Sequence, residues 1–501
     1  MSEAMVGVNA LHSSPHQRRS LRAQEERETP LHVICEGGDG VTMSKNIERA
    51  SWSGKWAFIL AAAASAVGLG NMWRFPYLAA KYGGGTFLLT YIVLVFTFGA
   101  SMLLLETALG RKTGMSAIGA FKHYGKKYAF IGVLTSAIPF IIVPYYCIIG
   151  GWVTKYMVGY LVDGPLAIAA EGGSYFVNFV YGDMSTYFWM TVFMVVVFIV
   201  VALGVKGGIE KVNLVMMPTL ILLAVGIAIY TMTMPGALEG VLYYITPDFS
   251  KFSPELVIGA LGQMFYSLSL AMGIMITYGS YLEKKESLPS SVVRVGGFDL
   301  GVSFLAGLMI VPAAFVAMGS AEAVAAKAGP SLMFITLPTV FTDMGGMATV
   351  IGFLFFLLVF FAAATSAISL TETCASIIQD ATQWSRKKCL GIVFVFIFVF
   401  GAFINAGYNV LIGIEPLGPG TQILDFADFV TNSVMMPIAA LLTCIFVGWL
   451  VKPQDLIDEI KISSAFKLEK AWVIMIKFIA PVLLVIILVA YVAATFGFFS
   501  M

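Results

Sequence analysis

Eleven long apolar segments constrain the fold of this chain more than any other feature of its sequence. They lie at about 55–80, 86–110, 128–160, 187–205, 210–233, 255–282, 295–320, 347–379, 390–407, 423–450 and 471–498. Each has about the 20 residues that an α-helix needs to cross a bilayer. Backbone polar groups in a bilayer must be satisfied within the protein, so only helices and closed barrels span it. The sequence therefore predicts an all-α integral membrane protein.

The composition agrees with a membrane protein and excludes several functional classes. Hydrophobic residues make up 59 % of the chain and charged residues 12 %, whereas about a quarter of a soluble domain is charged. The net charge of +1 does not suggest a nucleic-acid partner. The five cysteines lack metal-ligand spacing, and the four histidines lie in the N-terminal segment or in a loop. We therefore expect neither an enzyme nor an organic cofactor.

The first 50 residues differ in kind from the rest. They are polar and lack the apolar core of a signal peptide, so residues 1–50 are expected to form a disordered cytoplasmic tail; a start at Met43 is an alternative. Lysine and arginine concentrate in alternate connections between the spans. By the positive-inside rule, the N-terminus lies in the cytoplasm and the C-terminus outside the cell (inner or plasma) membrane.

The first span is interrupted between Ser65 and Pro76, where Gly68, Gly70 and Asn71 weaken the helix and Arg74 adds a charge. A helix breaks at membrane depth only where the freed backbone groups face protein, water or a ligand. The alternative is that the glycines only let helices approach closely. The polar residues beside them favour a binding site.

A second interrupted segment, 263–273, lies in the sixth span. Transporters built from inverted repeats carry broken helices at corresponding positions of the two halves, with the binding site between them. The alternative, that Ser267 and Ser269 bond back to their own helix, does not explain why the two interruptions lie five spans apart.

The motif V-G-L-G-N-M-W-R-F-P, from Val67 to Pro76, is joined by Gly83–Gly85, by the pair Tyr145 and Tyr146, and by Thr365-Ser366. With these motifs the chain resembles the neurotransmitter:sodium symporter family, of the bacterial leucine-transporter type, and its multi-hydrophobic amino-acid transporter subgroup with eleven helices. The resemblance implies a 5+5 inverted repeat with helices 1 and 6 broken. It assigns 51–233 to the first repeat (spans 1–5), 255–450 to the second (spans 6–10) and 471–498 to the eleventh transmembrane helix.

The resemblance also implies a function: sodium-coupled symport of amino acids into the cell by alternating access, without chloride. Glycine at position 68, where monoamine carriers have aspartate, favours an amino acid, and the apolar pocket with Met272 favours large hydrophobic or aromatic side chains. The implied substrate-binding residues are Ala66, Leu69, Gly70, Ile142, Tyr146, Tyr266, Ser267, Ser269, Met272, Ser366 and Leu370.

Two sodium sites are implied as well, built from the hard oxygen ligands that suit such a cation. The first consists of Ala66, Asn71, Ser267 and Asp299. The second consists of Ala64, Val67, Ala362, Thr365 and Ser366.

Asp299 departs from the chloride-dependent members of the family, which have asparagine at the matching position. The other chloride-site matches, Tyr91, Gln263 and Ser303, are present. A fixed carboxylate would offset the sodium charge, so chloride should be unnecessary. Two alternatives stay open: that Asp299 also carries a proton outward, or that it is a water-accessible structural residue.

The resemblance places gates on both sides of the site. The outer gate would pair Arg74 with Asp428, and Asp425 is an alternative partner on the same helix face. The inner gate would involve Arg49, Asp380 and Tyr281. Gly208 and Pro218 match a motif at which the fifth helix unwinds; an ordinary loop glycine and a tolerated membrane proline are the alternative.

Three other functional classes remain: a channel, a chloride-coupled osmolyte or amine symporter, and a sodium-dependent amino-acid sensor with little transport. Paired gates argue against a channel, Asp299 argues against chloride coupling, and a short tail argues against a signalling receptor. The expected partners are the amino acid, sodium ions and the lipid bilayer. A homodimer is an open alternative.

Overall fold

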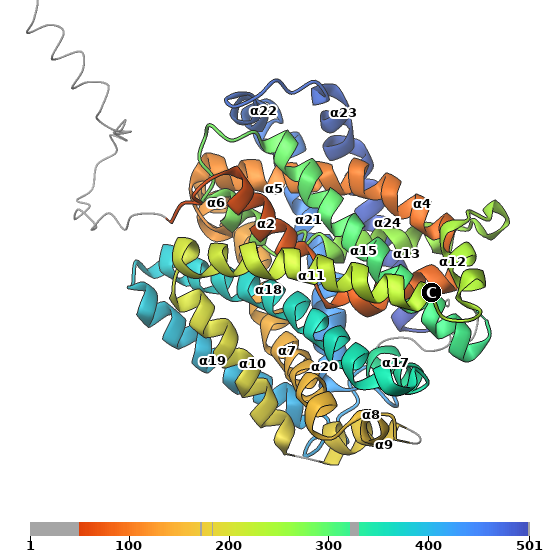
Figure 1. Ribbon diagram of the computed structural model, residues 1–501. Coiled ribbons are helices and arrows are strands. Elements are labelled where there is room, and N and C mark those ends of the chain that lie inside the picture. The colour runs from red at the N-terminus through yellow and green to blue at the C-terminus, as the bar shows by residue number, and fades with distance from the viewer. Residues whose placement is uncertain (1–49, 171–172, 183, 321–329, 499–501) are drawn as a thin grey trace, which may run out of the picture. The chain divides into compact units, whose positions relative to one another are not determined.

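The computed structural model describes residues 50–170, 173–182, 184–320 and 330–498 (Figure 1). The predicted tail, apart from its last residue, and the inner-gate residue Arg49 lie outside this part of the chain. The described residues are helical almost throughout, and they contain one isolated β-bridge, between Gly84 and Pro247.

Nine uninterrupted helices in the described part are long and apolar enough to cross a bilayer, and one bent pair makes ten. The nine are Gly85–Thr113 (with α4 and α5), Lys126–Val162 (α7), Ser185–Ala202 (α10), Val205–Met232 (α11), Leu288–Met318 (α15), Gly345–Thr382 (α18), Arg386–Ala406 (α19), Ile423–Val451 (α20 and α21) and Glu469–Thr495 (α23 and α24). The expected sixth span, at about 255–282, is divided between two shorter helices and is not counted among these ten. Shorter helices lie in the connections: α6 (Ala117–His123), α8 (Pro165–Ile168), α9 (Ser174–Val177), α12 (Ala237–Ile245), α17 (Leu337–Thr342) and α22 (Gln454–Lys461).

The first span is broken where the sequence predicts it. Helix α2 (Lys55–Ala66) ends before Val67, whose backbone is extended, and the span resumes with a π-helical turn, Gly70–Arg74, and α3 (Phe75–Lys81). The two halves are bent by 56°. The break frees carbonyls at the end of α2 and amides at the start of the second half, all within the protein.

The sixth span is broken as well, between α13 (Pro254–Ser267) and α14 (Ile274–Gly279). Three residues of the break have left-handed backbones: Ser269 (φ 53°), Ala271 (φ 61°) and Gly273 (φ 72°). Outside glycine such a conformation costs about 1–3 kcal/mol and persists where the surroundings enforce it, often at functional sites.

The breaks are enclosed by long neighbouring helices. Helix α2 packs against α11, α15 and α18, and α18 lies along α7 (Figure 1). The α7–α18 contact is close because Gly352 faces the ring of Tyr160, where any Cβ would overlap the ring. This packing brings residues of the third, seventh and eighth spans to the two breaks.

Candidate functional site

A central cavity of ≈ 30 Å³ lies between the two breaks. All eleven residues predicted to bind the substrate line it, together with Ser65, Gly68, Asn71 and Ile274. The structure thus brings together residues from the first, third, sixth and eighth spans that the sequence assigned to one pocket.

One end of the central cavity presents groups that suit a carboxylate. The Leu69 amide donates to the Tyr146 hydroxyl at 3.1 Å, at the start of the second half of the first span. A helix N-terminus attracts anions because its amides are free and its dipole is positive there. A Cβ on Gly68 would lie 2.8 Å from the Ser366 hydroxyl and 2.9 Å from that of Tyr146, so a larger residue would displace both hydroxyls from this end of the cavity.

The carbonyl end of α2 lies at the other side of the break. The hydroxyls of Ser269 and Ser366 donate to the Ser65 carbonyl at 3.0 and 3.1 Å. The negative end of a helix favours a cation, so a substrate ammonium fits here. The sequence named the neighbouring Ala66 and missed Ser65.

The remaining wall of the cavity is apolar. Ile142, Met272, Ile274 and Leu370 are each at most 4 % exposed. A wall of aliphatic side chains and a methionine suits a hydrophobic side chain and offers no partner to a polar one.

The predicted first sodium site is assembled around Asn71. Its side-chain nitrogen lies 2.8 Å from each of three oxygens, on Ser267, Asp299 and Ser303, and Ser267 donates to Asp299 at 2.5 Å. These residues are at most 3 % exposed. An amide nitrogen carries two hydrogens, so three acceptors exceed what it can satisfy. The surplus of buried oxygens, with one carboxylate, suits a small cation.

The predicted second sodium site is brought together in part. The Ser366 hydroxyl lies 3.3 Å from the Val67 carbonyl, joining the eighth span to the first break. Thr365 donates within its own helix, to the carbonyls of Phe361 and Ala362 at 2.9 and 3.2 Å. Ala64 and Ala362 are fully buried.

Asp299 accepts a hydrogen bond from one of the three groups that the resemblance assigns to a chloride site. Tyr91 donates to its second carboxylate oxygen at 2.7 Å. The Gln263 amide donates instead to the Gly70 carbonyl at 3.2 Å. Of the three chloride-site matches, Tyr91 therefore bonds to the carboxylate, whereas Gln263 and Ser303 bond to Gly70 and Asn71.

A second cavity, of ≈ 330 Å³, is separated from the central one by Leu69, Tyr146 and Tyr266, which line both. The predicted outer-gate residues Arg74 and Asp428 both line the second cavity. The ion pairs of the described residues do not include this pair within 4.0 Å.

Each predicted gate residue has another partner. Arg74 donates to the Tyr491 hydroxyl at 3.0 Å. Asp428 accepts from Tyr145 at 3.2 Å and from Asn432 at 2.5 Å. Asp425, the alternative partner, accepts from the Gln422 amide at 2.7 Å as part of a helix cap.

At the opposite end of the first span, Trp52 is packed against the end of the sixth. Its indole donates to the Tyr278 carbonyl at 3.0 Å, and its ring meets that of Tyr281 edge-on. Of the predicted inner-gate residues, Tyr281 donates to Glu372 at 2.9 Å and Asp380 accepts from the Ser116 amide at 2.7 Å. Gly208 and Pro218 lie in a continuous helix, Val205–Met232.

Two buried acids that contact the sixth span were not predicted from the sequence. Glu106 of α5 accepts from the Ala271 amide at 2.7 Å, within the second break. Glu372 of α18 is fully buried and pairs with Arg386 at 2.5 Å. Each is an acid inside an apolar span, a signal that marks a functional candidate by default and that could have found both.

The profile of the family described as "Sodium:neurotransmitter symporter family" matches residues 49–167 and 181–497. The chain belongs to this family. The family consists of transporters rather than enzymes, so the chain is a sodium-dependent, multi-pass membrane transporter.

Relatives of this symporter support the same assignment. An uncharacterized sodium-dependent transporter, YhdH, of Bacillus subtilis (strain 168) is 35 % identical over 87 % of this chain and 96 % of its own. One of Haemophilus influenzae is 31 % identical over 89 % of this chain and 99 % of its own.

A solved relative has the same fold. The crystal structure of MhsT in complex with L-phenylalanine matches with a TM-score of 0.79 and 35 % identity, over 88 % of this chain and 100 % of that one. The leucine-transporter-type fold expected from the sequence is therefore confirmed.

Proposed function

We propose that this symporter couples the inward movement of sodium to the uptake of large hydrophobic or aromatic amino acids. The observation that carries the proposal is the central cavity, where a carboxylate site, a set of carbonyls and an apolar wall meet beside the oxygens around Asn71. A zwitterion with an apolar side chain satisfies all three surfaces. The binding of L-phenylalanine by MhsT supports the same substrate class.

Two sodium ions are proposed, one at Asn71, Ser267 and Asp299 and one beside Val67 and Ser366. With a membrane potential of about 100 mV and a roughly tenfold gradient, each ion supplies about 2.3 plus 1.4 kcal/mol. Two ions would then sustain a gradient of about 10⁵ for a neutral zwitterion.

Chloride is proposed to be unnecessary. The Asp299 carboxylate already accepts hydrogen bonds from Tyr91 and Ser267. An added anion would find these donors engaged and would lie against a buried negative charge.

The proposed orientation has the N-terminus in the cytoplasm, as the loop lysines and arginines indicate. The second cavity then faces outside, and the Trp52 end faces the cytoplasm. Closure between Arg74 and Asp428 on one side, and around Tyr281 and Asp380 on the other, would give alternating access.

Equilibrium binding to the purified protein tests the substrate and ion requirements without transport. Labelled phenylalanine should bind in sodium chloride and equally in sodium gluconate, and should not bind in potassium chloride. Unlabelled tryptophan, tyrosine and leucine should compete, whereas taurine and dopamine should not. Competition by taurine together with a loss of binding in gluconate would favour the chloride-coupled osmolyte alternative.

A further inference from the structure

Arg74 is held by a residue outside both predicted repeats. Its guanidinium donates to the hydroxyl of Tyr491 on α24 (Ala480–Thr495) at 3.0 Å and lies 5.7 Å from the centre of that ring. It also lies 6.0 Å from the centre of the Tyr266 ring, the ring that borders both cavities. The eleventh span therefore contacts the residue at the mouth of the site.

The carboxylate that could pair with Arg74 is held on a different helix. Asp428 lines the same ≈ 330 Å³ cavity as Arg74 and Tyr491, and its hydrogen bonds go to Tyr145 and Asn432. Opposite charges across one cavity attract, so narrowing the cavity would bring the guanidinium to a stronger partner than a phenol.

Tyr491 also touches the helix that leads to the second break. Its hydroxyl packs on Gly262 of α13, where any Cβ would overlap the ring. Gly262 precedes Tyr266 by one helical turn. Tyr491 thus contacts both interrupted spans, so a movement of its ring would affect Arg74 in the first span and Gly262 in the sixth.

We propose that Tyr491 is a positioning residue that keeps Arg74 away from Asp428 while the second cavity is open. On closure Arg74 leaves the phenol for the carboxylate. A neutral hydroxyl suits this role because its bond to the guanidinium is weaker than a charged pair and can be exchanged. The inference rests on the proposed function, because it assigns closure of the second cavity to Arg74 and Asp428.

The test measures how easily the second cavity is reached from water. Ser433 lines this cavity, so Ser433→Cys in the full-length protein can be labelled with a water-soluble methanethiosulfonate reagent. The native cysteines described in the structure are buried, and the protein without Ser433→Cys gives the background rate.

Adding Tyr491→Phe removes the hydroxyl and keeps the ring. In sodium without substrate, the labelling rate should fall about tenfold, the effect of one hydrogen bond to a charged group. Asp428→Asn should raise the rate, because it removes the closing partner. Tyr243→Phe is the matched control: its hydroxyl donates to the Ala80 carbonyl at 2.7 Å, at the end of the same first span, and its loss should leave the rate unchanged.

The outcomes separate the two proposals. If sodium plus phenylalanine does not slow labelling of Ser433→Cys alone, the proposed closure itself is wrong. If sodium plus phenylalanine does slow labelling, but the protein with both Ser433→Cys and Tyr491→Phe is labelled as fast as Ser433→Cys alone or faster, the role of Tyr491 is overturned. If Tyr491→Phe fails to bind phenylalanine, Gly262→Ala, which displaces the Tyr491 ring, replaces it in the test. Gly262→Ala must then slow the labelling of Ser433→Cys in sodium without substrate, and an unchanged rate overturns the role of Tyr491.

Discussion

The side-chain nitrogen of Asn71 lies 2.8 Å from a carboxylate oxygen of Asp299, although 228 positions separate them in the chain. Asn71 belongs to the break of the first span and Asp299 to the seventh span. Ser267, at the end of α13, contacts both. One buried acid is therefore bonded to both broken helices, and its charge can link ion binding to their arrangement.

Replacing the acid tests this link. Asp299→Asn removes the fixed negative charge while keeping a side chain of the same shape. We expect uptake to become dependent on chloride, because an anion must then offset the sodium charge near Asn71. Uptake measured in chloride and in gluconate gives the answer.

A matched acid distinguishes the charge from simple damage to the fold. Glu239 is an acid in the connection after the fifth span, on α12, so Glu239→Gln should leave uptake equal in the two anions. Asp299→Asn uptake that is active and still indifferent to chloride would contradict the fixed-charge account.

Gly68 is predicted to be irreplaceable because of the two hydroxyls that face it. Gly68→Ala would place a methyl group 2.8 and 2.9 Å from the Ser366 and Tyr146 oxygens and should reduce sodium-dependent phenylalanine binding to background. Gly226→Ala, in α11 with open space at its Cβ, is the control and should bind normally. Normal binding by Gly68→Ala would mean that the carboxylate does not lie there.

The Tyr146 hydroxyl is predicted to bind the substrate carboxylate. Tyr146→Phe should raise the dissociation constant for phenylalanine about 10- to 100-fold, since a hydrogen bond to a charged group is lost. Phenylalaninamide, which lacks the carboxylate, should show the same weak affinity with both proteins. A similar loss for both ligands would point to general disruption of the pocket.

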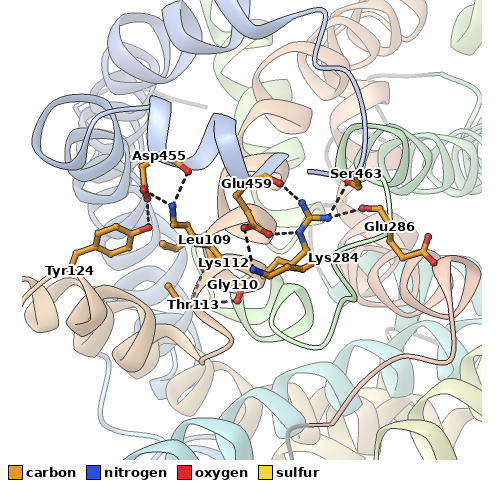
Figure 2. A network of polar contacts seen from close by, with 11 residues as sticks. Leu109, Gly110, Lys112, Thr113, Tyr124, Lys284, Glu286, Asp455, Glu459 and Ser463 are labelled. Atoms are coloured by element: carbon orange, nitrogen blue, oxygen red, sulfur yellow. Dashed lines mark hydrogen bonds and ion pairs between the residues drawn. The ribbon is translucent and has the colours of Figure 1, made fainter. Parts of the chain in front are cut away.

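The buried ion pair between Arg111 and Glu459 is predicted to stabilise the connection between the tenth and eleventh spans. Arg111 Nε and Glu459 Oε1 lie 2.8 Å apart, and both side chains are at most 4 % exposed. Arg111 also donates to the Glu286 carbonyl and to Ser463, and Figure 2 shows Glu459, Glu286 and Ser463 around this guanidinium. Glu459→Gln leaves the guanidinium unpaired, which costs about 3–5 kcal/mol in buried sites, and should lower the apparent melting temperature in detergent.

An exposed pair provides the comparison for this prediction. Lys285 and Glu283 lie 2.6 Å apart with side chains 72 % and 45 % exposed, and such pairs contribute little because water screens them. Glu283→Gln should leave the melting temperature unchanged. Equal shifts for the two variants would show that burial of the Arg111 pair adds nothing.

The spans and their breaks were accessible from the sequence because their determinants are local. Spans follow from apolar length, and the breaks follow from Gly68, Gly70 and the serines of the sixth span. All eleven predicted substrate residues line one cavity, but most of them lie outside the Val67–Pro76 motif and were assigned by the family resemblance.

Contacts between distant helices were not accessible in the same way. Nothing near Tyr491 in the sequence indicates that Arg74 bonds to Tyr491 in preference to Asp428. The partner of Arg74 depends on how the eleventh span packs on the first and sixth spans. Glu106 and Glu372 carried a readable signal, but their partners, Ala271 and Arg386, are set by tertiary packing.

The most direct test of the central claim is uptake of labelled phenylalanine into proteoliposomes. The inside contains potassium and the outside contains sodium or potassium, each with chloride or gluconate. We predict accumulation above equilibrium only with external sodium, and equally with both anions. Accumulation without sodium, or sodium-dependent binding with no accumulation, would contradict the proposal that this chain is a sodium-coupled amino-acid symporter.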